Sequence, residues 1–146
     1  MQHWPCPRLL HPHSLRHYHI PRSQRIVVSE PCSQLSSALS RLAELLDRID
    51  HPRAAEVRAL SALLGTAPDQ ALQRLDANDW WAGVGSLAAE TMGDNPGLPE
   101  TVWQTEVREF RELMIEIGEV LHARGAANPG IASWLLAFNN WNASGV

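Results

Sequence analysis

The chain of 146 residues is 45% hydrophobic and 19% charged, so it has room for one core and too much apolar sequence for wholesale disorder. It contains no lysine, and residues 30–146 hold eight arginines and all 16 acidic residues, a formal charge of −8. An acidic, lysine-free domain disfavours nucleic acid as a ligand and favours a basic partner.

Residues 1–30 form a segment rich in histidine, proline and arginine, in which apolar residues show no periodicity. Because it has no apolar stripe to bury, we expect a disordered arm. The composition changes abruptly near residues 26–28, which raises a second hypothesis. In that hypothesis translation has been assigned to an upstream start, and the arm is absent from the mature protein.

Apolar residues recur at helical spacing through residues 31–142, beginning with a stripe over 33–50 that steps by four and three. Two short helices are expected next, then the longest helix over about 99–124, and a final helix after a turn at 128–130. The predicted core positions are Leu35, Leu39, Leu42, Leu46, Ile49, Val57, Leu60, Leu64, Trp103, Val107, Phe110, Met114, Ile117, Leu121, Ile131, Trp134, Leu135 and Phe138. No segment alternates with the period of two that strands require. The sequence therefore predicts an all-α bundle of five or six helices over 31–142, followed by a tail at 143–146.

An aromatic turn precedes the longest helix, and in it Trp80 and Trp81 are followed by Gly83 and Gly85. Glycines two apart weaken a helix, so a turn or a broken helix is expected here. Adjacent side chains on a helix project in different directions, which predicts that at least one of the two tryptophans is exposed. Exposed tryptophan is a frequent binding anchor, so these four residues are the predicted binding site, beside a shallow apolar groove.

Two residues of the longest helix have the spacing of metal ligands, because Glu119 and His122 match the Glu-x-x-His pattern of di-iron carboxylate bundles. Such a site needs a second copy of the pattern and two further glutamates, and the chain has no second copy. The histidines of the arm are interpreted as adventitious metal binders. We therefore predict no metal, no cofactor and no catalytic residue.

A row of glutamates on the same helix is interpreted as a solvated face rather than as acid–base machinery. Its density makes it a plausible surface for a basic partner. The row consists of Glu106, Glu109, Glu112, Glu116 and Glu119.

Cysteine content and hydropathy give an expectation for the cellular compartment of the protein. Cys6 and Cys32 are the only cysteines, Cys32 is interpreted as a structural or incidental thiol, and a reducing cytoplasm is the expected compartment. The longest apolar run, residues 134–138, is far shorter than the roughly 20 residues that span a bilayer. We expect no membrane partner.

The layout over residues 35–121 consists of an amphipathic helix, a short helix pair, the aromatic turn and a long helix. It resembles small uncharacterised bacterial helical domains, and that resemblance implies no activity or site residue. Two hypotheses follow for the function. The first is a non-enzymatic interaction protein, of the immunity or regulatory type. The second is a small helical enzyme or metal-binding bundle that uses Glu119 and His122.

Overall fold

The computed structural model describes residues 22–91, 99–125 and 128–145, and these residues form seven helices and no strand. This confirms the all-α prediction. The number exceeds the expected five or six because the aromatic turn contributes two helices of four residues each. The helices are α1 (Arg22–Arg48), α2 (Ala54–Thr66), α3 (Pro68–Leu75), α4 (Asn78–Trp81), α5 (Leu87–Glu90), α6 (Glu100–Ala123) and α7 (Gly130–Ser144).

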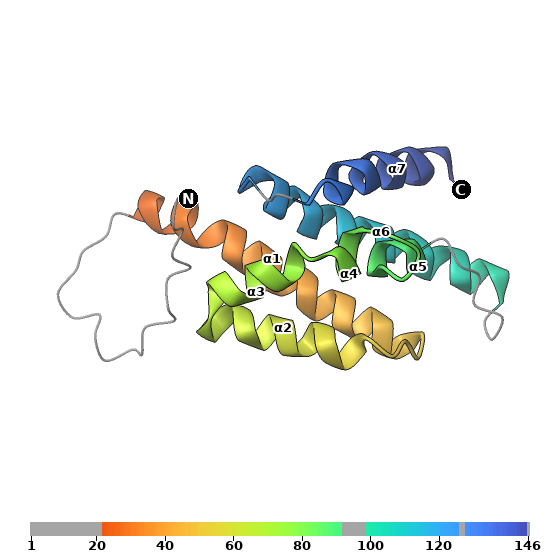
Figure 1. The fold of residues 1–146 in the computed structure, drawn as a ribbon, viewed down its shortest axis with the longest axis horizontal. Helices are drawn as coiled ribbons and strands as arrows, with labels where there is room; N and C mark the ends of the chain where they lie inside the picture. The colour runs from red at the N-terminus through yellow and green to blue at the C-terminus, as the bar shows by residue number, and fades with distance from the viewer. Residues whose placement is uncertain (1–21, 92–98, 126–127, 146) are drawn as a thin grey trace.

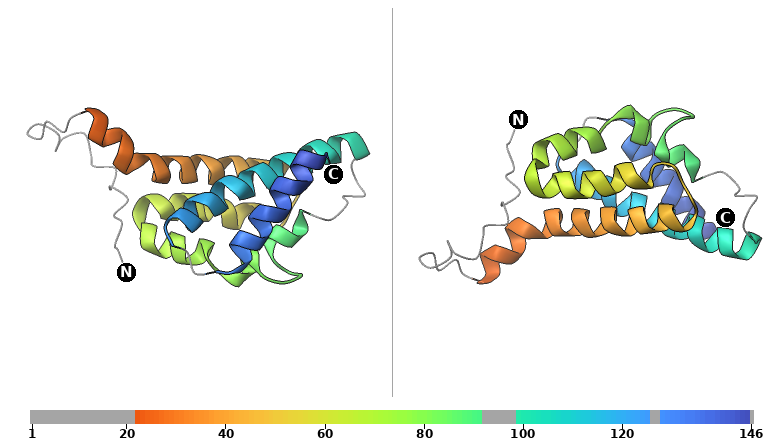
Figure 2. Two further views of the ribbon diagram at one scale, coloured as in Figure 1. Left: turned by 90° about the horizontal axis from the view of Figure 1, so that it is seen from above. Right: turned by 90° about the horizontal axis from the view of Figure 1, so that it is seen from below.

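The outer boundaries of the helical region differ from those predicted. The first helix begins at Arg22 rather than near residue 33, so part of the expected arm is helical, and residues 1–21 lie outside the described residues. Pro31 falls inside α1, although proline has no backbone N–H to donate to the helix. Figure 2 shows that α1 bends in its N-terminal part. At the other end, α7 continues to Ser144, so the expected tail begins two residues late.

Four helices form a row in the order α2, α1, α6 and α7, because α1 packs on both α2 and α6 and α7 packs on the far side of α6 (Figure 1). The segment from α3 to α5 crosses the front of this row in that view. Short connections make α1 and α2 antiparallel neighbours. The small helix α4 also contacts α7, although about 50 residues separate them in the chain.

The predicted stripes form the core of the row. Phe110 and the leucines of α1 are buried, as helical spacing requires when one face of each helix meets its neighbours. Trp103, Trp134, Ile49 and Leu135 were also predicted to lie in the core, but they are only partly buried. Among the described residues, no helix is both long enough and apolar enough to cross a membrane.

Candidate functional site

Trp80 and Trp81 are both fully buried, which contradicts the prediction that at least one is exposed. Different parts of the fold cover them. The Trp81 ring lies against α6 at Gly118, where a Cβ atom would be 3.2 Å from it. The Trp80 ring lies under Arg53 at the start of α2, with the guanidinium carbon 5.7 Å from the ring centroid. Because α4 is enclosed from two sides, neither indole forms the wall of an exposed groove.

The two indoles differ in hydrogen bonding. The Trp81 Nε1–H donates to the carbonyl oxygen of Leu75 at 2.6 Å, while its own carbonyl accepts from Trp134 Nε1 at 2.8 Å. The Nε1 of Trp80 is buried and has no hydrogen-bond partner among the described residues. Trp81 is therefore fixed by packing and by directional bonds to two neighbouring segments, whereas Trp80 is held by packing and by the Arg53 cation.

After this buried pair the chain forms a short loop, residues 82–86, which bows outward between α4 and α5 (green in Figure 2). Gly83 has φ +87°, a left-handed conformation that favours glycine. Ser86 closes the loop: its Oγ donates to the Gly83 carbonyl at 2.8 Å and accepts the backbone N–H of Ala89 at 3.3 Å, capping α5. Between the two glycines, Val84 is 96% exposed. The turn therefore presents an apolar tip that is not aromatic.

The helices on either side of the 82–86 loop, α4 and α5, are called its stems here, and both contact the α1–α2 corner, residues 49–53. On the α4 side, Arg53 donates to the carbonyl oxygen of Asp79 at 2.8 Å and to its carboxylate at 3.3 Å. On the α5 side, the Glu90 carboxylate lies 3.7 Å from Nε2 of His51. Arg53 is itself held by Glu56 through two hydrogen bonds of 3.0 and 3.3 Å. Two residues of one corner thus contact the helices on either side of the loop.

His51 is neutral in this arrangement, because its Nδ1 accepts the backbone N–H of Arg53 at 3.1 Å. The proton of the ring is then on Nε2, facing Glu90. Burial lowers the pKa of His51 below its ordinary value, and the Glu90 carboxylate opposes that shift. With Nδ1 occupied and Nε2 protonated, the ring has no lone pair to offer as a general base or a metal ligand.

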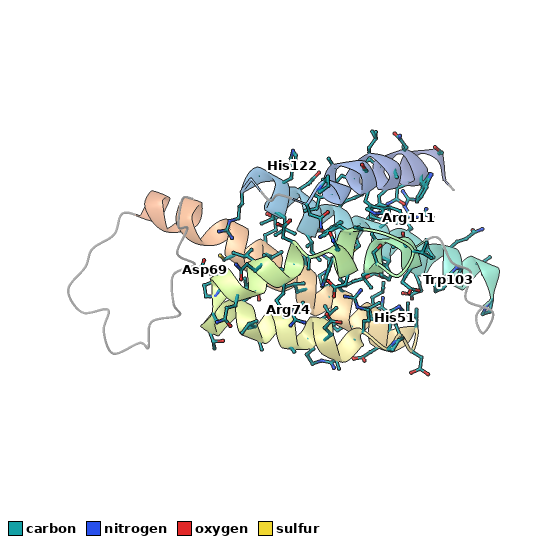
Figure 3. The ribbon with its side chains drawn as sticks, viewed as in Figure 1. His51, Asp69, Arg74, Trp103, Arg111 and His122 are labelled. Atoms are coloured by element: carbon teal, nitrogen blue, oxygen red, sulfur yellow. The ribbon has the colours of Figure 1, made fainter. Side chains whose placement is uncertain are left out.

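Glu119 and His122, the predicted metal pair, are both exposed on α6. Figure 3 shows His122 far from His51, towards the other end of the molecule. Within residues 22–91, 99–125 and 128–145, no three His, Cys, Asp or Glu side chains are grouped so that they could hold a metal ion. The histidines of the arm lie outside the described residues.

Most of the predicted glutamate row is engaged within the molecule. Glu106 and Glu109 both bind Arg48 of α1, at 3.0 and 2.8 Å, and Glu116 lies 3.4 Å from Arg41. Glu112 pairs with Arg108 one turn earlier on α6 at 3.4 Å. The row therefore joins α6 to α1, and much of its charge is already neutralised.

Cys32 is disulfide-bonded, so of its two interpretations the incidental free thiol is wrong, whereas a structural role agrees with the bond. A disulfide removes the thiolate, so Cys32 is no nucleophile in this state.

The sequence missed Val84, His51 and Arg53. A signal for Val84 was present, since an apolar residue between two glycines belongs to no helical stripe and has no face to bury. His51 and Arg53 gave no such signal, because only the tertiary fold brings them next to Glu90 and Asp79, which are distant in the sequence.

Comparison of the chain with protein-family models, with curated proteins and with solved structures found no match.

Proposed function

We propose that this chain is a non-catalytic protein-interaction module that contacts its partner through the 82–86 loop. The observation that carries the proposal is the exposure of Val84. Among the described residues, Val84 and Leu136 are the large hydrophobic side chains that remain exposed, and Val84 is exposed almost completely. Leaving an apolar side chain in water gains nothing for folding, whereas burying it in a partner's pocket stabilises a complex.

The loop is built to hold this tip in place. Its base is the buried pair Trp80 and Trp81, and its two ends are fixed by Ser86 and by the α1–α2 corner. A preorganised contact loses little conformational entropy on binding, which is the main cost that a flexible loop would meet. The proposal therefore differs from the site predicted from the sequence, because it assigns the contact to the loop that contains Gly83 and Gly85 and gives Trp80 and Trp81 a supporting role.

The surroundings of the tip indicate the kind of partner. The loop itself has no charged residue, while Asp79 and Glu90 on its stems have side chains that are 56% and 50% exposed. Asp79 is paired with Arg53, whereas Glu90 faces the neutral His51 and keeps its charge, so an apolar tip beside Glu90 fits an apolar pocket with a basic group at its rim. A basic partner was also expected from the formal charge of the domain.

A photo-cross-linking experiment tests the proposal. Benzoylphenylalanine is placed at position 84, and at position 136 as a matched control, because Leu136 is an exposed apolar residue that belongs to α7 and not to the loop. Each form is expressed, and then irradiated, in cells of the kind in which the wild-type chain naturally occurs. We expect one discrete protein adduct from position 84 that is absent from position 136.

Competition makes the result specific. Excess unlabelled wild-type chain should suppress the adduct, and excess Val84→Asp chain should not, whereas Leu136→Asp chain should compete like the wild type. The same adducts from both positions, no adduct from position 84, or full competition by Val84→Asp would each contradict the proposal.

A further inference from the structure

The α1–α2 corner holds the 82–86 loop through two adjacent contacts that share one titratable group. Arg53 binds Asp79 on the α4 stem, and His51 faces Glu90 on the α5 stem. The two corner residues are themselves linked, since the backbone N–H of Arg53 donates to Nδ1 of His51 at 3.1 Å. Figure 3 shows His51 at this corner, beneath α5.

Protonation of His51 is incompatible with this geometry. A protonated imidazole carries N–H groups on both nitrogens, so Nδ1 would point a proton at the N–H of Arg53 instead of accepting its hydrogen bond. The His51 side chain is only 13% exposed, so it cannot exchange this partner for water without moving. Movement of His51 or of the Arg53 backbone would disturb the contacts on both stems.

We propose that His51 and Arg53 form a pH-sensitive clamp, which fixes both stems of the 82–86 loop at neutral pH and releases them in acid. The inference rests on the proposed function, because it takes the 82–86 loop to be the binding loop. The clamp would then regulate binding: Val84 is held rigidly when the pH is above the ordinary pKa of histidine and becomes mobile when the pH is below it.

The charged groups that face His51 act in opposite directions. Glu90 of α5 favours the imidazolium and Arg53 at the start of α2 disfavours it, but burial is the largest effect, and the pKa of His51 is lowered. The released form has a histidine of ordinary pKa, about 6.5. The clamped form therefore binds protons less readily, and it loses stability relative to the released form as the pH falls below that value.

Hydrogen exchange of the full chain tests the clamp. Protection factors are measured for the amides of residues 78–90 between pH 7.5 and pH 5, after correction for the intrinsic dependence of exchange on pH. For the wild type we expect a severalfold loss of protection, because the clamped form binds the proton on His51 less readily than the released form does. The amides of α6 serve as an internal reference and should lose less.

Three variants make the result decisive. His51→Asn keeps a side-chain oxygen near the position of Nδ1 but does not titrate, so the loss should vanish. Glu90→Gln removes the carboxylate that favours the imidazolium, so the loss should grow. His122→Asn, at an exposed histidine on α6, should behave like the wild type.

A wild-type loss that disappears in His51→Asn and persists in His122→Asn supports the clamp. A wild type with no loss, or an equal loss in His51→Asn, overturns it. Should His51→Asn fail to fold, an unchanged or smaller loss in Glu90→Gln overturns it instead. Hydrogen exchange involves no partner, so the clamp can be overturned while cross-linking still supports the binding loop. Equally, the clamp can be supported while cross-linking fails.

Discussion

Trp80 and Trp81 on α4 and the loop that follows them are neighbours in sequence, yet they lie at opposite extremes of exposure. The two tryptophans have no exposed surface, while Val84, three residues further on, is 96% exposed. The tryptophans are held by α2, α6 and α7, whereas hydrogen bonds within the loop and the capping of α5 set its shape. The difference separates stability from contact: changes to the base should unfold the domain, and changes to the tip should leave it folded.

The largest effect is expected from removal of the buried ring of Trp81. Trp81→Ala should lower the free energy of unfolding by about 3–5 kcal/mol, because it leaves a cavity and deprives the Leu75 carbonyl of its donor. Urea unfolding followed by circular dichroism at 222 nm measures the change. A loss under about 1 kcal/mol would mean that Trp81 does not support the fold.

Two glycines show the same contrast between buried base and exposed loop: Gly130 packs against Trp81, whereas Gly85 lies in the loop with open space around it. A Cβ atom at Gly130 would lie 2.2 Å from the carbonyl oxygen of Trp81, so Gly130→Ala must push α7 away from α4. We expect a loss of about 1–3 kcal/mol, the usual cost of overpacking. At Gly85 a Cβ meets nothing within 4 Å and the φ is not positive, so Gly85→Ala is the matched control. Equal losses in the two variants would contradict this division.

A smaller difference is expected between the two tryptophans. Trp81→Phe breaks the hydrogen bond to Leu75, whereas Trp80→Phe removes an N–H that has no partner among the described residues. Trp81→Phe should therefore be the more destabilising by about 1 kcal/mol, the ordinary contribution of one buried hydrogen bond. Parallel urea titrations give the difference directly, and a reversed order would show that packing at Trp80 matters more than the bond at Trp81.

The smallest effect is expected at the tip. Val84→Asp replaces an exposed side chain in a loop, so the free energy of unfolding should change by no more than about 0.5 kcal/mol. Thermal unfolding of the variant beside the wild type measures this. A melting temperature lowered by several degrees would show that Val84 packs against the domain and is not a free contact.

The fold could be predicted to a greater extent than the site, and the reason is the range of the contacts involved. Stripes such as that of Leu35, Leu39 and Leu42 depend on helical spacing alone, so their burial follows from local sequence. The burial of Trp81 depends on α6 and that of Trp80 on the α1–α2 corner, and both come from distant parts of the chain. The tie from Arg53 to Asp79 likewise spans 26 positions, and no local pattern predicts it.

The affinity of Val84→Asp for the protein that cross-links at position 84 tests the division between base and tip most directly. Isothermal titration at neutral pH with purified full-length chain measures it, with Leu136→Asp as the control. We expect the Kd of Val84→Asp to rise by at least about tenfold, a loss of about 1.4 kcal/mol of binding free energy, while its melting temperature and the affinity of Leu136→Asp stay at wild-type values. Wild-type affinity in a folded Val84→Asp chain would contradict the assignment of the 82–86 loop as the contact surface.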